Sequence, residues 1–255
     1  MEKVCGGNRE QAFPILMDKP MISIVIVTRN AEADLPACLQ SINEQRYQNL
    51  QIIIFDGAST DGTIEIIQNY NKYISYWQSE PDKGIYDAMN KAVKKASGQW
   101  IYFLGADDVL LPGFSEMAIR LVNPSTIYYG DCLTDKSLKL DGVFSAYRLT
   151  KMNICHHAVF YPQLVFSKYH YPVQFPVYAD HALNIQCWGD KTFSRTYIPI
   201  EIAKFKTTGF SSTTQDELFK KEKGNWIKKY LGAFIYFRYQ LKKWKESKKE
   251  GSRFF

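Results

Sequence analysis

The sequence predicts an α/β fold in which helices lie on both faces of a mostly parallel central sheet. Two observations support this prediction. Short runs of apolar, β-branched and aromatic residues recur along the first half of the chain, as in strands that are buried on both faces. Each run is followed by a segment with helical spacing of its apolar residues, and strands that alternate with helices form parallel sheets.

Four strand–helix units are expected between residues 22 and 124. The strands are "ISIVIVT" (22–28), "QIIIFDG" (51–57), "ISYWQSE" (74–80) and "WIYFLGA" (100–106). Helices are expected at about 34–46, at 64–71, at 85–97 and from Pro112 onward. "STDGT" (59–63) supplies turn and N-cap residues before the second helix, and Gly98 ends the third.

The second half is expected to contain more strands. "STIYYGD" (125–131) and "GVFSAY" (142–147) predict strands, and "FSRTYIPIEIAKFK" (193–206) predicts two short strands broken at Pro199. "YADHALNIQCWGD" (178–190) predicts a helix. We therefore expect an irregular N-terminal extension (1–20), one domain (21–212) with halves 21–124 and 125–212, and a basic amphipathic helical segment at the C-terminus (213–255).

Composition limits the class of protein. The 255 residues are 45% hydrophobic and 23% charged, which is typical of a globular chain. Five scattered cysteines without a CxxC spacing indicate reduced thiols and a cytoplasmic location. No run of about 20 apolar residues is present, so no transmembrane helix is expected.

The net charge of +6 is concentrated from Lys220 to Arg253. This tail indicates an anionic partner such as phospholipid headgroups, nucleic acid or a phosphorylated substrate, or else a solvated helix face. Between Trp226 and Trp244 the cations alternate with aromatic residues, which fits an interfacial helix on an anionic membrane surface. A helix that packs on the domain with its basic residues outward is the alternative.

Polar residues follow every predicted strand of the first half. Because ligands bind at the carboxyl ends of parallel strands, these residues form the candidate site. They are Thr28 and Asn30, Asp56, Glu80 to Lys83, and the adjacent pair Asp107 and Asp108. Paired carboxylates suit Mn²⁺ or Mg²⁺ together with phosphate oxygens, although one aspartate could instead cap a turn and the other could be solvated. No GxGxxG, GxxxxGK[ST], HExxH or GxSxG motif is present.

Four segments in sequence order resemble family 2 glycosyltransferases with the GT-A fold, of the kind that build bacterial surface polysaccharides. They are "ISIVIVTRN", "IIIFDGASTDGT", "DKGIYDAMNKAVKKASGQWIYFLGADDVLLP" and "HHAVF…YADHALNIQ", over roughly residues 21–190. The resemblance implies an inverting transfer from a nucleotide-sugar, usually a UDP-sugar, with a divalent metal. It also implies a polyprenyl-diphosphate-linked saccharide acceptor and a location on the inner face of the cell membrane.

The resemblance implies roles for residues on the nucleotide side. Thr28 and Asn30 match positions near the nucleotide. Asp56 matches the aspartate that hydrogen-bonds the base, although it could instead cap the turn at 59–63. The segment that contains Lys83, Asp87 and Asn90 matches a loop and helix start beside the ribose and diphosphate, although Asp87 could simply favour the helix dipole.

The resemblance also implies roles for residues nearer the reacting groups. Asp107 matches the principal metal ligand, with Asp108 behind it. Asp180 matches the general base, although it could be only a helix N-cap. His156 matches a histidine before the acceptor-side segment, and His157 is a further candidate, although both could be a polar strand end.

The sequence departs from the family pattern at several positions. Gly105 stands where an aspartate is frequent, His157 stands where glutamine is frequent, and Ala179 replaces the glutamate of a common Glu-Asp pair. These departures leave the donor sugar open. Two other classes remain as alternatives: a nucleotidyltransferase, and a non-catalytic module that binds lipid or nucleic acid through the basic tail.

Overall fold

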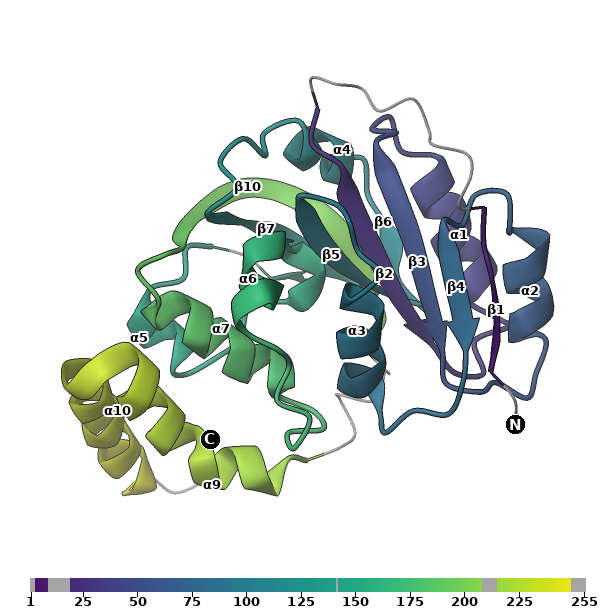
Figure 1. Cartoon of the computed structure of the whole chain (residues 1–255). Helices are drawn as coiled ribbons and strands as arrows, with labels where there is room; N and C mark the ends of the chain where they lie inside the picture. Colours follow the sequence, from purple (N-terminus) through teal and green to yellow (C-terminus); the bar gives the residue numbers. More distant parts are fainter. Residues whose placement is uncertain (1–2, 9–18, 141, 208–214, 249–255) are drawn as a thin grey trace.

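A ten-stranded mixed sheet runs through the centre of the protein (Figure 1). The computed structural model describes residues 3–8, 19–140, 142–207 and 215–248. The order of the strands is β1-β4-β3-β2-β5-β9-β7-β10-β6, and β8 pairs with β7. The strands are β1 (Val4–Gly6), β2 (Ile22–Thr28), β3 (Leu50–Asp56), β4 (Tyr76–Ser79), β5 (Trp100–Gly105), β6 (Val109–Leu110), β7 (Thr126–Thr134), β8 (Lys139–Leu140), β9 (Val159–Pro162) and β10 (Ser194–Phe205).

The predicted parallel core of the sheet is confirmed. Strands β4, β3, β2 and β5 are parallel neighbours, and the register places Thr28 beside Asp56 and Asp56 beside Ser79. The carboxyl ends of these strands therefore lie at one edge, as the polar residues after each strand led us to expect. Beyond β5 the sheet becomes mixed, because β9 is antiparallel to both β5 and β7 while β10 is parallel to β7.

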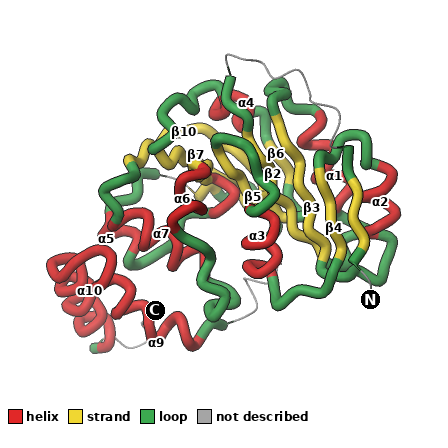
Figure 2. Tube along the Cα trace, viewed as in Figure 1, coloured by secondary structure: helices red, strands yellow, loops and turns green. Residues whose placement is uncertain are grey.

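Helices cover both faces of the sheet (Figure 2). Alternate residues of each central strand point to opposite faces, so β2 contributes Ile24 to one core and Val25 to the other. The first core packs under α1 (Leu35–Asn43), α2 (Thr63–Asn69) and α4 (Gly113–Ala118). The second packs under α3 (Ile85–Val93), α5 (Ala146–Leu149), α6 (Gln163–Lys168) and α7 (Ala179–Gly189).

The C-terminal segment is helical, as expected, and joins the second core. It consists of α9 (Glu217–Trp226), one π-helical turn (Ile227–Leu231) and α10 (Gly232–Ser247). Phe219, Ile227 and Tyr239 are its buried members of that core. None of the helices in the described ranges is both long and apolar enough to cross a bilayer.

Three predicted elements were wrong. Residues 142–147 were expected to form a strand, but their last two residues begin helix α5, whose N-cap Ser145 accepts a hydrogen bond from the Arg148 amide. Residues 194–205 form one strand instead of two, since a bulge between Tyr197 and Ala203 lets the strand continue past Pro199, which has no N–H to donate. Within the expected irregular extension, β1 pairs with β4.

The expected domain boundaries stay predictions. One sheet spans both expected halves, 21–124 and 125–212. The expected boundary between 212 and 213 lies outside the described residues, as does most of the expected extension 1–20.

We predict that Gly189→Ala loosens the docking of the C-terminal helices. A Cβ at residue 189 would overlap the carbonyl oxygen of Tyr230, so backbone must shift, at a cost of about 1–3 kcal/mol in the free energy of unfolding. Gly224→Ala in helix α9 is the matched control. The nearest atom to a Cβ at residue 224 would be in the Tyr236 ring, 3.6 Å away, and alanine in a helix stabilises by about 1 kcal/mol relative to glycine. Urea unfolding measures both, and equal effects of the two substitutions would contradict this packing.

Candidate active site

The carboxyl edge of the parallel strands is organised around Asp56. This buried carboxylate accepts hydrogen bonds from the hydroxyls of Thr28 (2.9 Å), Ser79 (2.6 Å) and Ser59, and from the Ser59 amide (2.9 Å). Four donors fill the acceptor positions of a carboxylate. Asp56 therefore fixes the ends of three strands, and a hydrogen bond to a nucleotide base would require one of these donors to turn away.

Asn30 holds the loops after β2 and β3 together. It adopts a left-handed backbone conformation with φ of 52°, which asparagine tolerates better than most residues. Its side-chain oxygen accepts from the Thr60 amide at 2.9 Å, and its own amide donates to the Ser59 hydroxyl at 2.8 Å. Asn30 is itself exposed, so it forms part of the rim of this edge.

The three candidates around α3 differ in their surroundings. Lys83 is exposed before the helix, and its amide donates to Asp87 at 3.0 Å. Asp87 also pairs with Lys91 at 3.1 Å. Partial burial acts to raise the pKa of Asp87, but the hydrogen bond from the Lys83 amide and the charges of Lys91 and Lys83 hold this pKa below its usual value. Asn90 exchanges two hydrogen bonds with the backbone of Tyr171, at 2.9 and 3.0 Å. Asn90 therefore joins helix α3 to the loop after α6.

The two aspartates after β5 lie in different environments. Asp108 is 4% exposed; its Oδ2 forms an ion pair with His157 Nε2 at 2.7 Å, and its Oδ1 accepts from the Lys206 amide at 3.0 Å. Asp107 is half-buried, and its carboxylate enters no ion pair among the described residues. Burial and the adjacent charge of Asp108 raise the pKa of Asp107.

The absence of a side chain at Gly105 is linked to the position of Asp108. A Cβ at residue 105 would overlap Asp108 Oδ2 and would lie 3.0 Å from Asp107 Oδ1. An aspartate at this position would therefore displace Asp108 from its present orientation. Gly105 allows Asp108 to turn inward to His157.

His157 is the buried cation of this arrangement. Burial opposes its charge, but the Asp108 carboxylate raises the pKa of His157 to about 10, so the ring is protonated at neutral pH. Its other nitrogen, Nδ1, lies 3.5 Å from the Cys155 sulfur, and the ring of Phe205 stacks on it with centroids 5.5 Å apart. His157 therefore neutralises Asp108.

These contacts decide how a divalent metal would fit. Asp108 has both oxygens engaged by protein groups, so Asp107 is the carboxylate with room for a ligand. In the described part of the chain, no three acidic, histidine or cysteine side chains form a metal-binding group. Mg²⁺-type sites often use one or two carboxylates with substrate phosphates and water, so the residues fit a metal that is held jointly by Asp107 and a diphosphate.

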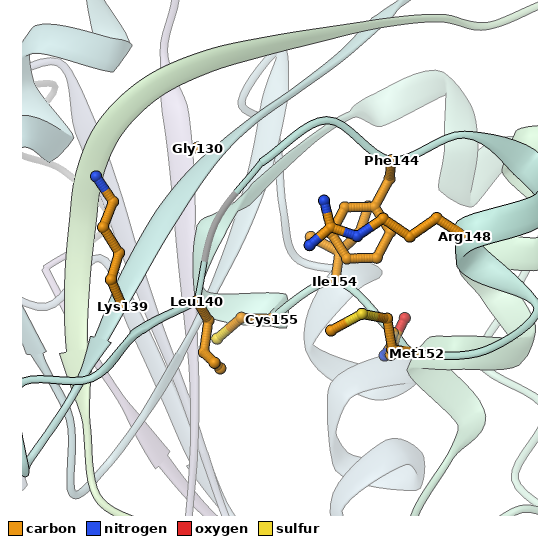
Figure 3. A pocket seen from close by; sticks show the side chains of 9 residues that line it. Gly130, Lys139, Leu140, Phe144, Arg148, Met152, Ile154 and Cys155 are labelled. Carbon is orange, nitrogen blue, oxygen red and sulfur yellow. The ribbon is translucent and has the colours of Figure 1, made fainter. Parts of the chain in front are cut away.

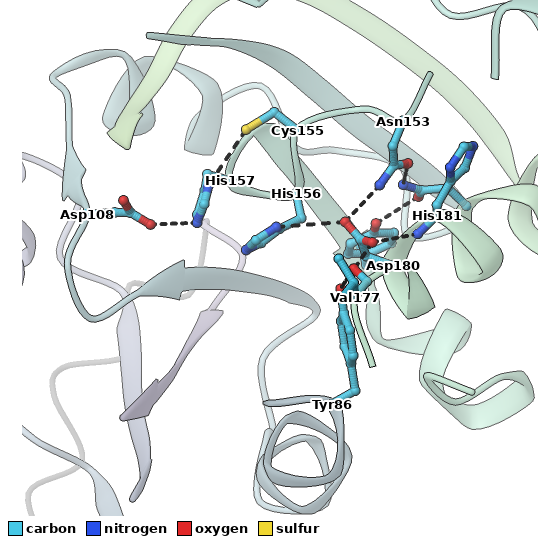
Figure 4. Close-up of polar contacts among 11 residues, drawn as sticks. Tyr86, Asp108, Asn153, Cys155, His156, His157, Val177, Asp180 and His181 are labelled. Atoms are coloured by element: carbon cyan, nitrogen blue, oxygen red, sulfur yellow. Dashed lines mark hydrogen bonds and ion pairs between the residues drawn. The ribbon is translucent and has the colours of Figure 1, made fainter. Parts of the chain in front are cut away.

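Asp180, in the first turn of α7, lies at the opposite end of a row of side chains (Figure 4). The rings of His157 and His156 are 3.8 Å apart between centroids, and His156 Nδ1 is 3.8 Å from Asp180 Oδ2. Two imidazole rings therefore connect Asp108 to Asp180. This row therefore brings together Asp108, His156, His157 and Asp180, which the sequence analysis named as candidates nearer the reacting groups.

Asp180 is held by three donors. Tyr86 donates to Oδ1 at 3.1 Å, Asn153 donates to Oδ2 at 2.7 Å, and the His181 amide donates to Oδ1 at 2.7 Å. Burial nevertheless dominates and raises the pKa of Asp180 to about 6. Burial and the charge of His157 lower the pKa of His156, so its ring is neutral at pH 7 and does not neutralise Asp180. Asp180 is thus a carboxylate whose basicity suits proton transfer near neutral pH.

Sequence reasoning missed three residues of this site. Tyr86 and Asn153 position Asp180, and Cys155 contacts His157. Tyr86 lies in the segment that contains the candidates Lys83, Asp87 and Asn90. Because it is one helical turn before Asn90, it could have been named as a candidate from the sequence. Asn153 and Cys155 come from the loop after α5, which carries no motif. Contacts with Cys132 and with protonated His157 lower the pKa of Cys155 to about 5, against the effect of burial.

A pocket of about 130 Å³ adjoins the Asp180 network (Figure 3). Its lining includes Asn153 and Cys155, which also belong to that network. The remaining lining is largely apolar with two cations, and consists of Gly130, Lys139, Leu140, Phe144, Arg148, Met152 and Ile154. The pocket therefore offers a binding surface on the side of the sheet that was expected to hold the acceptor.

Comparison with solved structures identifies the fold. The chain superimposes on the crystal structure of Staphylococcus aureus TarS 1-349 in complex with UDP-GlcNAc with a TM-score of 0.69, over 91% of this chain and 74% of that chain, at 13% identity. The mannosyltransferase PcManGT from Pyrobaculum calidifontis, in complex with GDP-Man and Mn²⁺, gives a TM-score of 0.57 at 14% identity and covers 88% of this chain and 65% of that one. The fold is the GT-A fold, as the resemblance implied.

Comparison with sequences identifies the family. The model of "Glycosyl transferase family 2" matches residues 23–136. A PGL/p-HBAD biosynthesis glycosyltransferase of Mycobacterium tuberculosis is 35% identical over 216 residues, which are 80% of this chain and 84% of that protein. The GalNAc(5)-diNAcBac-PP-undecaprenol beta-1,3-glucosyltransferase of Campylobacter jejuni is 31% identical over 137 residues, 52% of this chain and 44% of that protein.

These matches decide between the classes that the sequence left open. The match to the mycobacterial relative covers most of both chains, and the matched family model spans the strands from β2 to β7. The nucleotidyltransferase and the non-catalytic binding module are therefore set aside. The chain is an enzyme, and it belongs to glycosyltransferase family 2.

Proposed function

We propose that the protein moves a sugar from a nucleotide-sugar to a hydroxyl of a lipid-linked saccharide, with inversion at the anomeric carbon, in the synthesis of a bacterial polysaccharide or O-antigen. The observation that carries this proposal is the buried Asp180, whose pKa of about 6 makes it a base at neutral pH. The rings of His156 and His157 lie between Asp180 and the aspartates that follow β5, where we expect the diphosphate to bind.

The donor side is supported by the edge around Asp56. Thr28, Asn30 and Lys83 surround the carboxyl ends of β2, β3 and β4, which is where α/β sheets bind nucleotides. Similar structures hold UDP-GlcNAc in TarS and GDP-Man in PcManGT. A UDP-sugar is the donor that we favour, with Asp56 and Asn30 ordering the loops that contact the nucleotide.

Asp107 is the residue that would hold Mn²⁺ or Mg²⁺ together with the donor diphosphate. Such a cation, when bound, supplies Lewis-acid stabilisation of the charge on the leaving diphosphate. Asp108 supports this site indirectly, because its ion pair with His157 fixes the backbone that carries Asp107. The protein itself contributes the fixed end of β5 and the buried Asp108–His157 pair, whose two charges neutralise each other.

Asp180 would take the proton from the acceptor hydroxyl. The hydroxyl oxygen forms a bond to the anomeric carbon while the bond from that carbon to the diphosphate oxygen breaks, and the hydroxyl proton goes to Asp180. Asp180 is the one carboxylate in the described hydrogen-bond network around it, and a single base with direct displacement inverts the centre. Tyr86 and Asn153 hold the carboxylate in position.

The acceptor side is supported by the pocket beside Asn153. Its apolar lining, with Met152 and Phe144, suits the carbon face of a sugar or an aglycone more than a second charged nucleotide. The Campylobacter relative is named for action on an undecaprenol-linked saccharide, and the mycobacterial relative for PGL/p-HBAD biosynthesis. A lipid-linked acceptor is therefore the class that we propose.

Asp180→Asn should lower the rate of sugar transfer by about 10²–10⁴-fold, the usual contribution of a general base. Affinity for the donor nucleotide should stay unchanged. In the wild type, kcat/KM should fall about tenfold per pH unit below about pH 6, because Asp180 becomes protonated there. Nucleotide release in the presence of acceptor measures the rate, and calorimetry measures donor binding. Full activity of Asp180→Asn would rule out the base role, whereas loss of donor binding would point to misfolding.

Tyr86→Phe should move the acid limb of that pH profile to higher pH. The Tyr86 hydroxyl donates to Asp180 and thereby lowers the pKa that burial raises, so its removal favours the protonated carboxyl. The fall in activity should be small at pH 8 and larger at pH 6. An unchanged acid limb would show that Tyr86 does not act through Asp180.

Asp107→Asn and Asp108→Asn should separate the roles of the adjacent aspartates. Asp107→Asn should weaken Mn²⁺-dependent UDP binding at least about tenfold, with stability nearly unchanged since Asp107 pairs with no described cation. Asp108→Asn should instead lower the free energy of unfolding by about 3–5 kcal/mol, because it breaks a buried ion pair. Calorimetry with and without Mn²⁺, combined with urea unfolding, makes the comparison. Wild-type UDP binding that is independent of any metal would refute the metal proposal.

A further inference from the structure

Helix α10 carries a stripe of exposed apolar side chains, which we call the α10 stripe. Its members are Phe234 (71% exposed), Phe237 (59%), Leu241 (41%) and Trp244 (56%). The spacing of three, four and three residues places all four within about 80° of the helix circumference. Four large apolar residues that share one solvent-facing surface indicate an interaction site more than scattered surface residues do.

The opposite side of α10 attaches the helix to the domain. Tyr239 is buried, and Ile235 and Tyr236 pack against the second core. The helix therefore has two apolar surfaces, one in the core and one that faces away from it. A helix that only packed on the domain would need the first surface alone.

Cations surround the α10 stripe. Lys248 Nζ lies 3.7 Å from the centroid of the Trp244 ring, and the Arg238 guanidinium lies 5.9 Å from that of Phe234. Lys245 is exposed on the same helix, about 20° around the helix circumference from Phe234. From Glu217 to Lys248 the chain has ten lysine and arginine residues against three glutamates. The surface thus combines apolar side chains with a strong positive charge.

We propose that the α10 stripe binds the surface of an anionic phospholipid bilayer. Aromatic and leucine side chains would enter the boundary between headgroups and acyl chains, while the flanking lysines and Arg238 would meet the lipid phosphates. A second copy of this chain fits less well, because a two-fold interface would bring the same basic surface against itself. Charge complementarity therefore favours the bilayer.

Docking through α10 would orient the enzyme. The Arg238 guanidinium lies 4.1 Å from the centroid of the Tyr147 ring in α5, the helix that precedes the pocket residues Met152 and Asn153. Strands β1 and β4 lie at the far side of the molecule (Figure 1). The acceptor side would thus be near the lipid and the nucleotide side farther from it. Bilayer binding itself does not depend on the proposed transfer reaction.

The test is co-sedimentation of the full chain with vesicles of equal parts phosphatidylglycerol and phosphatidylcholine, and with phosphatidylcholine vesicles alone. We expect wild type to partition at least about tenfold more strongly onto the anionic vesicles, and the difference to shrink with salt. The triple variant Phe234→Ser, Phe237→Ser, Trp244→Ser should bind at least about tenfold more weakly. Lys245→Glu with Lys248→Glu, which reverses the two lysine charges beside the stripe, should lose the preference for anionic lipid.

The control variant is Ile119→Ser with Val122→Ser, which removes apolar side chains that are 58% and 77% exposed near α4. It should bind vesicles as wild type does. Because all substituted side chains are exposed, thermal unfolding should be nearly unchanged in every variant, and a cooperative transition confirms folding. Equal vesicle binding by wild type and the triple variant would overturn the proposal. So would a dimer in light scattering that the triple variant converts to monomer, since the stripe would then be an interface between copies.

Discussion

The buried ion pair between Asp108 and His157 is the contact on which the site depends. It joins the end of β5 to the segment before β9, and the Lys206 amide adds the end of β10 to the same carboxylate. Three parts of the chain, separated by about 50 residues each, therefore meet at one buried charge. A buried pair of this kind is costly to desolvate and costly to break, so it fixes one arrangement of the strand ends.

That pair also decides what its neighbours can do. His157 neutralises Asp108, so the half-buried Asp107 is the one of these two aspartates that has room for a ligand. Burial and the positive charge of His157 lower the pKa of the neighbouring His156, and a neutral His156 does not neutralise Asp180. Burial can then raise the pKa of Asp180 toward neutrality. One charge pair thus places Asp107 and Asp180, the aspartates proposed as metal ligand and general base, in different surroundings.

Much of the fold could be predicted because its signals are local. Strand β2 was placed correctly by a run of apolar, β-branched residues, and α7 by Asp180 near its start and Gly189 near its end. The elements that failed depend on distant partners. Residues 142–147 have strand-like composition, yet Ser145 caps a short helix there because Phe144 and Leu149 pack into the second core. Strand β10 passes Pro199 only because β7 accommodates its bulge.

The sequence alone determined the family, the parallel sheet edge with its polar residues, and the adjacent pair Asp107 and Asp108 at the end of β5. Only the tertiary structure decided that Asp108 faces His157, that Asn90 joins two segments, and that Tyr86 and Asn153 hold Asp180. It also decided that the apolar residues of α10 face solvent as well as the core. The reason is physical: residue type and spacing specify local conformation, whereas charge state and exposure depend on groups that are brought together only by folding.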